Sequence, residues 1–341
     1  MVKILQGDCR EVLKTLPDGS VNCCVTSPPY FGLRDYKVDG QIGLEPTPDA
    51  YVAELVAVFR EVRRVLADDG TLWLNLGDSY ASYRDGKATP DTTRGNSTGT
   101  LVPKGEAKNR MASTFKRTAI KHKDLIGIPW RVAFALQADG WYLRQDIIWH
   151  KPNPMPESVK DRCTKSHEYV FLLSKSPRYY FDAEAIAEPV TQSTIERLSQ
   201  PNLENQIGSA RVPGKTNGNM KAKPPRFGGD KYGDDATDQS RTKSGNDYTM
   251  PTDGKRNKRS VWTVATQPYK EAHFATFPPK LISPMILAGC PVGGTVLDPF
   301  GGSGTTGEVA ERYGRNSILI ELNPAYIELQ KQRTAQMGLG L

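Results

Sequence analysis

The sequence predicts an α/β fold built on a mostly parallel β-sheet, with an antiparallel hairpin at one edge and long inserted segments. Short apolar strands alternate with helical patterns at both ends of the chain, which is typical of parallel strands joined by crossover helices. Residues 295–321 contain a strand, a glycine-rich loop, a helix and a second strand, the order of a mononucleotide-binding βαβ unit. Two β-rich runs, 142–149 and 169–173, have no helix between them, which predicts the antiparallel hairpin.

The predicted parallel strands are short apolar runs that end in polar or turn residues. They span residues 2–6, 21–26, 71–76, 295–298 and 317–321. Helices are predicted from apolar residues at helical spacing, from capping residues and from the βαβ order. They span residues 49–66, a stretch from about 129 to 139, 305–313 and 324–336.

Two stretches, 82–123 and about 192–259, interrupt this pattern. They are poor in aliphatic residues and rich in Gly, Pro, Thr, Asn, Lys and Arg, so they bury too little apolar surface to fold alone. Residues 101–125 carry 7 basic and 2 acidic side chains, and residues 211–260 carry 12 basic and 6 acidic ones. Either these are solvated insertions, or they are charged loops that order against a phosphate backbone.

Length and charge limit the class of protein. A chain of 341 residues is long enough for one large α/β domain with an insertion, and its net charge of +7 suits a polyanionic partner. Its 5 cysteines form no CxxC pair, so neither a disulfide framework nor a zinc site is expected. Without a signal peptide or a membrane-spanning apolar run, the predicted location is the cytoplasm.

The glycine loop points to a nucleoside ligand. Residues 298–306 follow a strand and open a helix, so the backbone can approach a ligand closely and present free N–H groups. Glu321 lies at the end of the next strand, where a carboxylate can accept both ribose hydroxyls. A dinucleotide such as NAD is one candidate, but Asp298 would repel its phosphates. Asp298 would instead receive an ammonium group, which favours S-adenosylmethionine.

A second strand ends in the tetrapeptide Ser27-Pro28-Pro29-Tyr30. Two consecutive prolines fix the backbone and remove two N–H donors, so the turn presents only acceptors to a ligand. Hydrogen bonds to the Ser27 side chain and the Pro28 carbonyl would favour a pyramidal amino nitrogen whose lone pair attacks a methyl sulfonium. Tyr30 could stack on the base. The alternative is a proline-rich turn or an SH3-type ligand.

Together these motifs resemble the family of DNA amino-methyltransferases, in the permuted order called the β type. In that family the Thr-Ser-Pro-Pro-Tyr motif comes early and the Asp-Pro-Phe-x-Gly-Ser-Gly-Thr-Thr loop comes late, as they do here at 26–30 and 298–306. The resemblance implies a Rossmann-like S-adenosylmethionine-dependent methyltransferase fold with a seven-stranded, circularly permuted sheet. It assigns 1–182 and 261–341 to the catalytic domain, with 82–123 as a basic loop insertion and 183–260 as the target-recognition region.

The resemblance also implies the site residues. Ser27, Pro28, Pro29 and Tyr30 are expected to be catalytic, and no metal is expected. The residues expected to bind the cofactor are Asp8, Cys9, Thr26, Phe277, Pro278, Lys280, Asp298, Pro299, Phe300, Gly301, Gly302, Ser303, Gly304, Thr305, Thr306, Glu321, Leu322 and Asn323. His167-Glu168 belongs to a similar middle section and either caps a strand or lines the target pocket.

The implied activity is site-specific methylation of a flipped-out base in double-stranded DNA. Serine in the tetrapeptide resembles the cytosine N4 members, while adenine N6 is the alternative. An RNA methyltransferase and an inactive DNA-binding module are further alternatives. The family often forms homodimers, and the resemblance also allows for a restriction endonuclease that acts on the same site.

Overall fold

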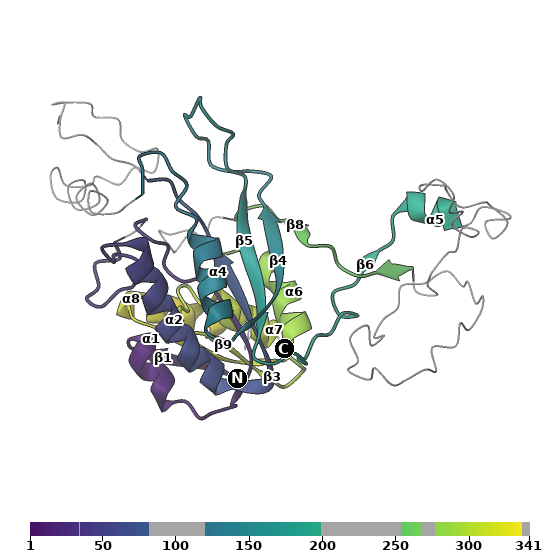
Figure 1. Ribbon diagram of the computed structural model, residues 1–341. Coiled ribbons are helices and arrows are strands. Elements are labelled where there is room, and N and C mark those ends of the chain that lie inside the picture. Colours follow the sequence, from purple (N-terminus) through teal and green to yellow (C-terminus); the bar gives the residue numbers. More distant parts are fainter. Residues whose placement is uncertain (34, 82–119, 199–253, 268–276, 336–341) are drawn as a thin grey trace, which may run out of the picture. The chain divides into compact units, whose positions relative to one another are not determined.

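The computed structural model describes residues 1–33, 35–81, 120–198, 254–267 and 277–335 (Figure 1). The chain divides into two compact units, Met1–Phe181 with Ser260–Leu341, and Asp182–Arg259. Most of the basic stretches at 82–123 and 192–259 lies outside the described residues. The same holds for much of the expected target-recognition region, so its role stays a prediction.

The first unit is built on one eight-stranded sheet in the order β1-β10-β9-β2-β3-β5-β4-β8. Its strands are β1 (Val2–Gln6), β2 (Val21–Thr26), β3 (Leu66–Leu76), β4 (Tyr142–His150), β5 (His167–Ser174), β8 (Val261–Thr263), β9 (Thr295–Asp298) and β10 (Asn316–Glu321). The first five in spatial order are parallel, and β5 runs antiparallel to β3 and β4. The mostly parallel sheet and its hairpin are therefore confirmed.

The predicted count of seven strands needs a correction. β8 adds an eighth strand, parallel to β4 and outside the hairpin, so β4 is not the edge strand. Three residues are too short to show a period-2 pattern, which is why the sequence did not predict β8. The helix α6 was not predicted either, because prolines at 279 and 284 read as breaks in a helix.

Helices cover both faces of the sheet (Figure 1). One face carries α1 (Cys9–Val12), α2 (Pro48–Val65) and α4 (Ile128–Ala138), with the short 3₁₀ turn η1 (Leu13–Thr15) beside them. The other face carries α6 (Pro279–Gly289), α7 (Thr305–Arg312) and α8 (Pro324–Ala335). Three layers with helices on both faces are the arrangement expected for a doubly wound α/β domain.

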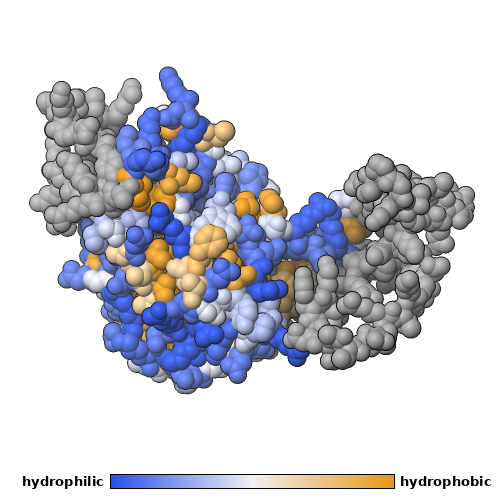
Figure 2. All heavy atoms as spheres, in the orientation of Figure 1, coloured by the Kyte–Doolittle hydropathy of each residue, from blue (hydrophilic) through white to orange (hydrophobic). Residues whose placement is uncertain are grey.

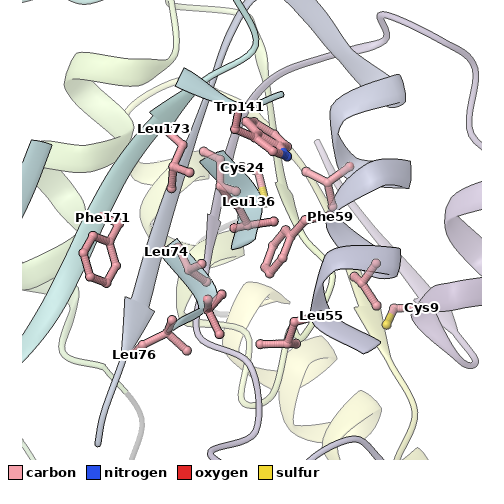
Figure 3. Close-up of a cluster of buried hydrophobic side chains, with 14 of the residues drawn as sticks. Cys9, Cys24, Leu55, Phe59, Leu74, Leu76, Leu136, Trp141, Phe171 and Leu173 are labelled. Carbon is pink, nitrogen blue, oxygen red and sulfur yellow. The ribbon is translucent and has the colours of Figure 1, made fainter. Parts of the chain in front are cut away.

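A large core forms where α2 and α4 pack on the sheet (Figure 3). Leu55 and Phe59 of α2 and Leu136 of α4 meet Leu74 and other alternate residues of β3, all of them fully buried. The side chains of α2 lie at helical spacing and those of β3 alternate, so each element presents one apolar face to the other. This packing holds the carboxyl ends of β2 and β3 rigidly in place.

The surface shown in Figure 2 is mostly hydrophilic, and its hydrophobic residues lie in small patches. Among the described residues, no helix is long and apolar enough to cross a membrane.

The second unit is small in its described part. β6 (Glu188–Pro189) pairs antiparallel with β7 (Lys255–Arg256), and α5 (Gln192–Leu198) follows β6. Glu188 forms ion pairs with Lys258 at 3.0 Å and Arg256 at 3.7 Å. The two-stranded ribbon is thus held by charges that the basic run at 255–259 supplies.

Candidate active site

A cavity of about 870 Å³ lies at the carboxyl ends of the parallel strands. The loops after β1, β2, β3, β9 and β10 all contribute to its lining. β9 and β2 are neighbours in the sheet. From β9 the chain continues to β10, toward one edge of the sheet, and from β2 it continues to β3, toward the other edge. Such a reversal opens a crevice at the strand ends, which is where α/β sheets bind their ligands.

Asp298, at the end of β9, is 1% exposed and still lines the cavity. Its Oδ1 accepts hydrogen bonds from Thr26 Oγ1 at 2.6 Å and from the Phe300 amide at 3.1 Å, while Oδ2 accepts one from Thr306 Oγ1 at 2.6 Å. Burial raises the pKa of Asp298 to about 6, although these hydrogen bonds oppose the shift. The site thus holds a buried carboxylate that can still be ionised at neutral pH.

Glu321, at the end of β10, is the second carboxylate of the cavity. The Gly302 amide donates to its Oε2 and the Asn323 amide to its Oε1, both at 2.8 Å. Burial raises the pKa of Glu321 to about 7, and these backbone hydrogen bonds limit the shift. Both oxygens keep free lone pairs, so the carboxylate is oriented and can accept two further hydroxyl donors.

The glycine loop between β9 and α7 brings the backbone to the cavity. Gly304 has a φ of 82°, a left-handed conformation that favours glycine, and it directly precedes α7. A Cβ at this position would lie 3.2 Å from the Gln330 Cα, so α8 also excludes a side chain there. Gln330 Nε2 in turn donates to the Gly302 carbonyl at 2.9 Å.

Asp8 begins α1 at the end of β1 and is tied to Arg10. It caps the helix through the Arg10 amide at 2.9 Å, and its Oδ2 lies 2.6 Å from Arg10 Nη2. Burial alone would raise the pKa of Asp8, but the hydrogen bonds from Arg10 outweigh it and hold the pKa below its ordinary value. The neighbouring Cys9 is buried, and burial raises the pKa of its thiol to about 12. The thiol is therefore uncharged at neutral pH.

The tetrapeptide leaves β2 and enters the same cavity. Ser27, Pro28, Pro29 and Tyr30 all line it. Tyr51 of α2 donates its hydroxyl to the Pro29 carbonyl at 2.8 Å. Among the described residues, no hydrogen bond is found on the Pro28 carbonyl. The Ser27 side chain and this carbonyl therefore remain as acceptors for a ligand.

Tyr30 is held by a polar group of side chains from β3, from β5 and from the residue directly after β4. Its hydroxyl donates to Glu168 Oε2 at 2.8 Å and lies 3.3 Å from Asn75 Oδ1. Lys151 forms an ion pair with the other oxygen of Glu168 and lies over the Trp149 ring, 4.2 Å from its centroid. Burial raises the pKa of Tyr30 well above its ordinary value, so the hydroxyl keeps its proton.

Replacing Gly77 by alanine should displace Tyr30. A Cβ at Gly77 would lie 2.4 Å from Tyr30 Cε2, far inside van der Waals contact, so the ring must move. We expect a loss of about 1–3 kcal/mol in the free energy of unfolding, the usual cost of overpacking. Chemical denaturation measures it. In a double-mutant cycle with Tyr30→Ala the loss should largely disappear, and an equal loss in both backgrounds would contradict the clash.

Most of the sequence-predicted residues meet at this cavity. Those that line it are Asp8, Cys9, Ser27, Pro28, Pro29, Tyr30, Phe277, Asp298, Pro299, Phe300, Gly301, Gly302, Ser303, Thr305, Glu321, Leu322 and Asn323. Thr26 and Thr306 lie behind it and support Asp298. Pro278 is buried before α6, and Lys280 is exposed on that helix and does not line the cavity.

The structure brings further polar residues to the cavity, beyond those expected to be catalytic or to bind the cofactor. Asn75, Asp78, Lys151, Lys165 and Glu168 line the cavity. Asp78 lies two residues after a predicted strand, and polar residues near the carboxyl ends of parallel strands are candidates for a site, so the sequence could have indicated it. Its carboxylate accepts hydrogen bonds from the Gly127 and Ile128 amides and caps α4. Lys165 Nζ donates to the Asp78 carbonyl at 3.1 Å, and burial lowers the pKa of Lys165.

Comparisons with known proteins agree with this geometry. Residues 21–332 match the N6_N4_Mtase family, described as DNA methylase. The type II methyltransferase M.Cfr9I of Citrobacter freundii is 43% identical over 330 residues, which cover 97% of this chain and 86% of that protein.

Two solved structures share the fold. TTHA0409 of Thermus thermophilus, solved with S-adenosyl-L-methionine, has a TM-score of 0.54 at 22% identity and covers 100% of this chain and 98% of that one. PvuII DNA methyltransferase, titled cytosine-N4-specific, has a TM-score of 0.58 at 18% identity and covers 97% of this chain and 86% of that one.

Proposed function

The chain belongs to the N6_N4_Mtase family of DNA methylases, and on that premise we propose that it methylates the exocyclic N4 of a cytosine in DNA. Membership makes it an S-adenosylmethionine-dependent DNA methyltransferase. One observation supports the choice of cytosine N4 over adenine N6. The tetrapeptide begins with a serine that lines the cavity next to the Pro28 carbonyl, which is an acceptor.

The cavity fits the cofactor by its size and by the chemistry of its acceptors. A volume of about 870 Å³ lies in the range of small-molecule and cofactor sites. Asp298 offers a buried negative charge to the α-amino group, and Glu321 offers two oriented oxygens to the ribose hydroxyls. S-adenosylmethionine, when bound, supplies a methyl group activated by a positive sulfur. Neither carboxylate would suit the phosphates of a dinucleotide.

The tetrapeptide prepares the amino group of the target base. Ser27 Oγ and the Pro28 carbonyl can each accept one of its two N–H bonds, which withdraws the nitrogen lone pair from the ring. The prolines keep both acceptors in place, and the bond from Tyr51 to Pro29 fixes the turn from behind. Because the nitrogen itself attacks the methyl group, no covalent intermediate with a protein side chain is required.

The donors near this turn favour cytosine over adenine. On the base edge that carries the amino group, cytosine has two acceptors, N3 and O2. The same edge of adenine has one acceptor, N1, and then a C–H. Lys165 also lines the cavity, with one of its three N–H donors on the Asp78 carbonyl and two left for a ligand. A serine hydroxyl can also donate, which a carboxylate in the same place could not.

The target atom lies within the duplex, so the base has to be flipped into the cavity. By analogy with M.Cfr9I, which is called a type II methyltransferase, we place the chain in restriction–modification, with a nuclease of the same site as its expected partner. Residues 82–123 and 183–260 would contact the phosphates on either side of the flipped base.

Mass spectrometry of nucleosides tests the proposal. DNA free of amino methylation is incubated with the protein and methyl-labelled S-adenosylmethionine, then digested to nucleosides. We expect label in N4-methylcytosine. Label in N6-methyladenine would keep the family chemistry and refute the choice of base, and label in neither would refute the activity.

Cofactor affinity should depend on pH through the two carboxylates. The ligand prefers their ionised forms, so affinity should be full above the pKa of Glu321, about 7, and should fall as the pH drops through this value and that of Asp298, about 6. Each pH unit below a pKa should cost up to about tenfold in affinity. Calorimetry from about pH 5 to about pH 8 measures this. Glu321→Gln should remove the upper part of the profile, and a flat wild-type profile would contradict the assignment.

A further inference from the structure

Glu168 is a carboxylate at the cavity that the mechanism above does not use. Its side chain is 15% exposed, at the start of β5. One oxygen pairs with Lys151, and the other accepts hydrogen bonds from Tyr30 Oη at 2.8 Å and Asn75 Nδ2 at 3.3 Å. A purely structural ion pair would need only the first oxygen. The second is directed at the tyrosine of the tetrapeptide.

The hydrogen bonds around Tyr30 run in one direction. Because Tyr30 donates its only proton to Glu168, its oxygen is left with lone pairs that can accept. Ser27 and Tyr30 belong to the same turn and both line the cavity. Burial raises the pKa of Tyr30, and a hydrogen bond from the Ser27 side chain opposes this shift. Ser27 can therefore donate to Tyr30 while its own oxygen accepts an N–H from the base. A chain of two hydroxyls then links the amino group to a carboxylate.

The reaction needs such an acceptor for a proton. When the amino nitrogen bonds the methyl carbon, the carbon–sulfur bond breaks and its electron pair stays on sulfur. The nitrogen, which kept both of its protons, is left positively charged and must release one of them. Serine alone is a poor final acceptor, because its hydroxyl is not basic at neutral pH.

We propose that Glu168 is the terminal proton acceptor of methyl transfer, reached through Ser27 and Tyr30; this rests on the function proposed above. One N–H proton moves to Ser27 Oγ as the Ser27 proton moves to Tyr30 Oη and the Tyr30 proton moves to Glu168 Oε2. Each hydroxyl gains and loses one proton, and Glu168 ends protonated. Before transfer, the same chain strengthens Ser27 as an acceptor, since successive hydrogen bonds polarise one another. Glu168 touches no reacting atom and acts only through Ser27 and Tyr30.

Substitutions of Lys151 and of Glu168 should have different effects on the rate of methyl transfer. Glu168→Gln keeps the size of the side chain and removes the acceptor, so we expect the single-turnover rate at saturating DNA and cofactor to fall by about 10²-fold, typical of general base catalysis. Lys151→Met removes the ion pair and leaves the carboxylate, so it should cost far less. A structural ion pair would make the two losses equal, and that result would overturn the proposal.

Tyr30→Phe breaks the chain at its middle and provides a second test should Glu168→Gln fold poorly. It should lower the same rate by a similar factor, and the double variant should be no slower than Tyr30→Phe alone, because residues acting as a unit are not additive. Glu61→Gln, which removes a comparable ion pair with Arg64 on α2, is the control. Wild-type protein that methylates no base would refute the proposed function; active wild type with a normal rate in Glu168→Gln would refute the relay alone.

Discussion

Ser27→Ala is expected to lower the single-turnover rate of methyl transfer by about 10³-fold, within the range of catalytic proton transfer and oriented acceptors. The serine is the one side chain of the tetrapeptide that can accept from the amino group and pass a proton on. Without it the nitrogen lone pair stays conjugated with the ring. Rapid-quench assays with labelled cofactor at saturating DNA measure the rate.

The affinity for S-adenosylmethionine should change by no more than a few fold in this variant, because the role proposed for Ser27 is to bind the target base and not the cofactor. Ser20→Ala is the matched control, since its hydroxyl only donates to the Pro17 carbonyl in an exposed turn. A Ser27→Ala protein that turns over at the wild-type rate would remove the serine from the mechanism and with it the basis for choosing cytosine.

The strand ends explain why much of this site could be predicted from the sequence. Thr26 and Asp298 each close a short apolar run, and a parallel sheet gathers such ends on one edge. What the sequence could not show is that β2 and β9 are neighbours. That adjacency lets Thr26 donate to Asp298 across 272 positions, and it depends on the strand order of the whole sheet.

The polar group around Tyr30 illustrates the opposite case. Asn75 lies in β3, Glu168 lies in β5 and Lys151 directly follows β4, and no spacing in the sequence relates them. They meet because β5 pairs antiparallel with both β3 and β4, so that Leu76 lies opposite Tyr169 and Trp149 opposite Glu168. His167-Glu168 resembles a segment of the family and was expected either to cap a strand or to line the target pocket. The contact of Glu168 with Tyr30 favours the second interpretation.

Burial of carboxylates is also invisible in the sequence. The sequence places Asp298 and Glu321 at strand ends but does not show their burial, which raises their pKa values to about 6 and about 7. Neither carboxylate forms an ion pair with a basic side chain of the described residues. Among the described residues, only hydroxyls and backbone amides offset the burial, which leaves the charge of both carboxylates available to a cationic ligand.

Asp298→Asn should therefore weaken the binding of S-adenosylmethionine by about 1.5–3 kcal/mol, the usual contribution of a charged hydrogen bond. By RT ln K this is a loss of roughly 10- to 150-fold in affinity. The amide is close in size to the carboxylate but neutral, so the ammonium loses its counter-charge while the cavity keeps its shape. The amide N–H₂ also faces a threonine hydroxyl that formerly donated, so some loss of stability should accompany the effect.

Calorimetry and denaturation on the same protein separate the two contributions of Asp298. If the carboxylate binds the ammonium, the affinity should fall for S-adenosylmethionine and much less for a cofactor analogue that lacks the amino group, because only the first ligand uses the charge. If it only braces the loop through Thr26 and Thr306, both ligands should weaken equally. Unchanged affinity for S-adenosylmethionine in Asp298→Asn would remove this residue from the cofactor site and leave Asp8 and Glu321 as the carboxylates expected to bind the cofactor.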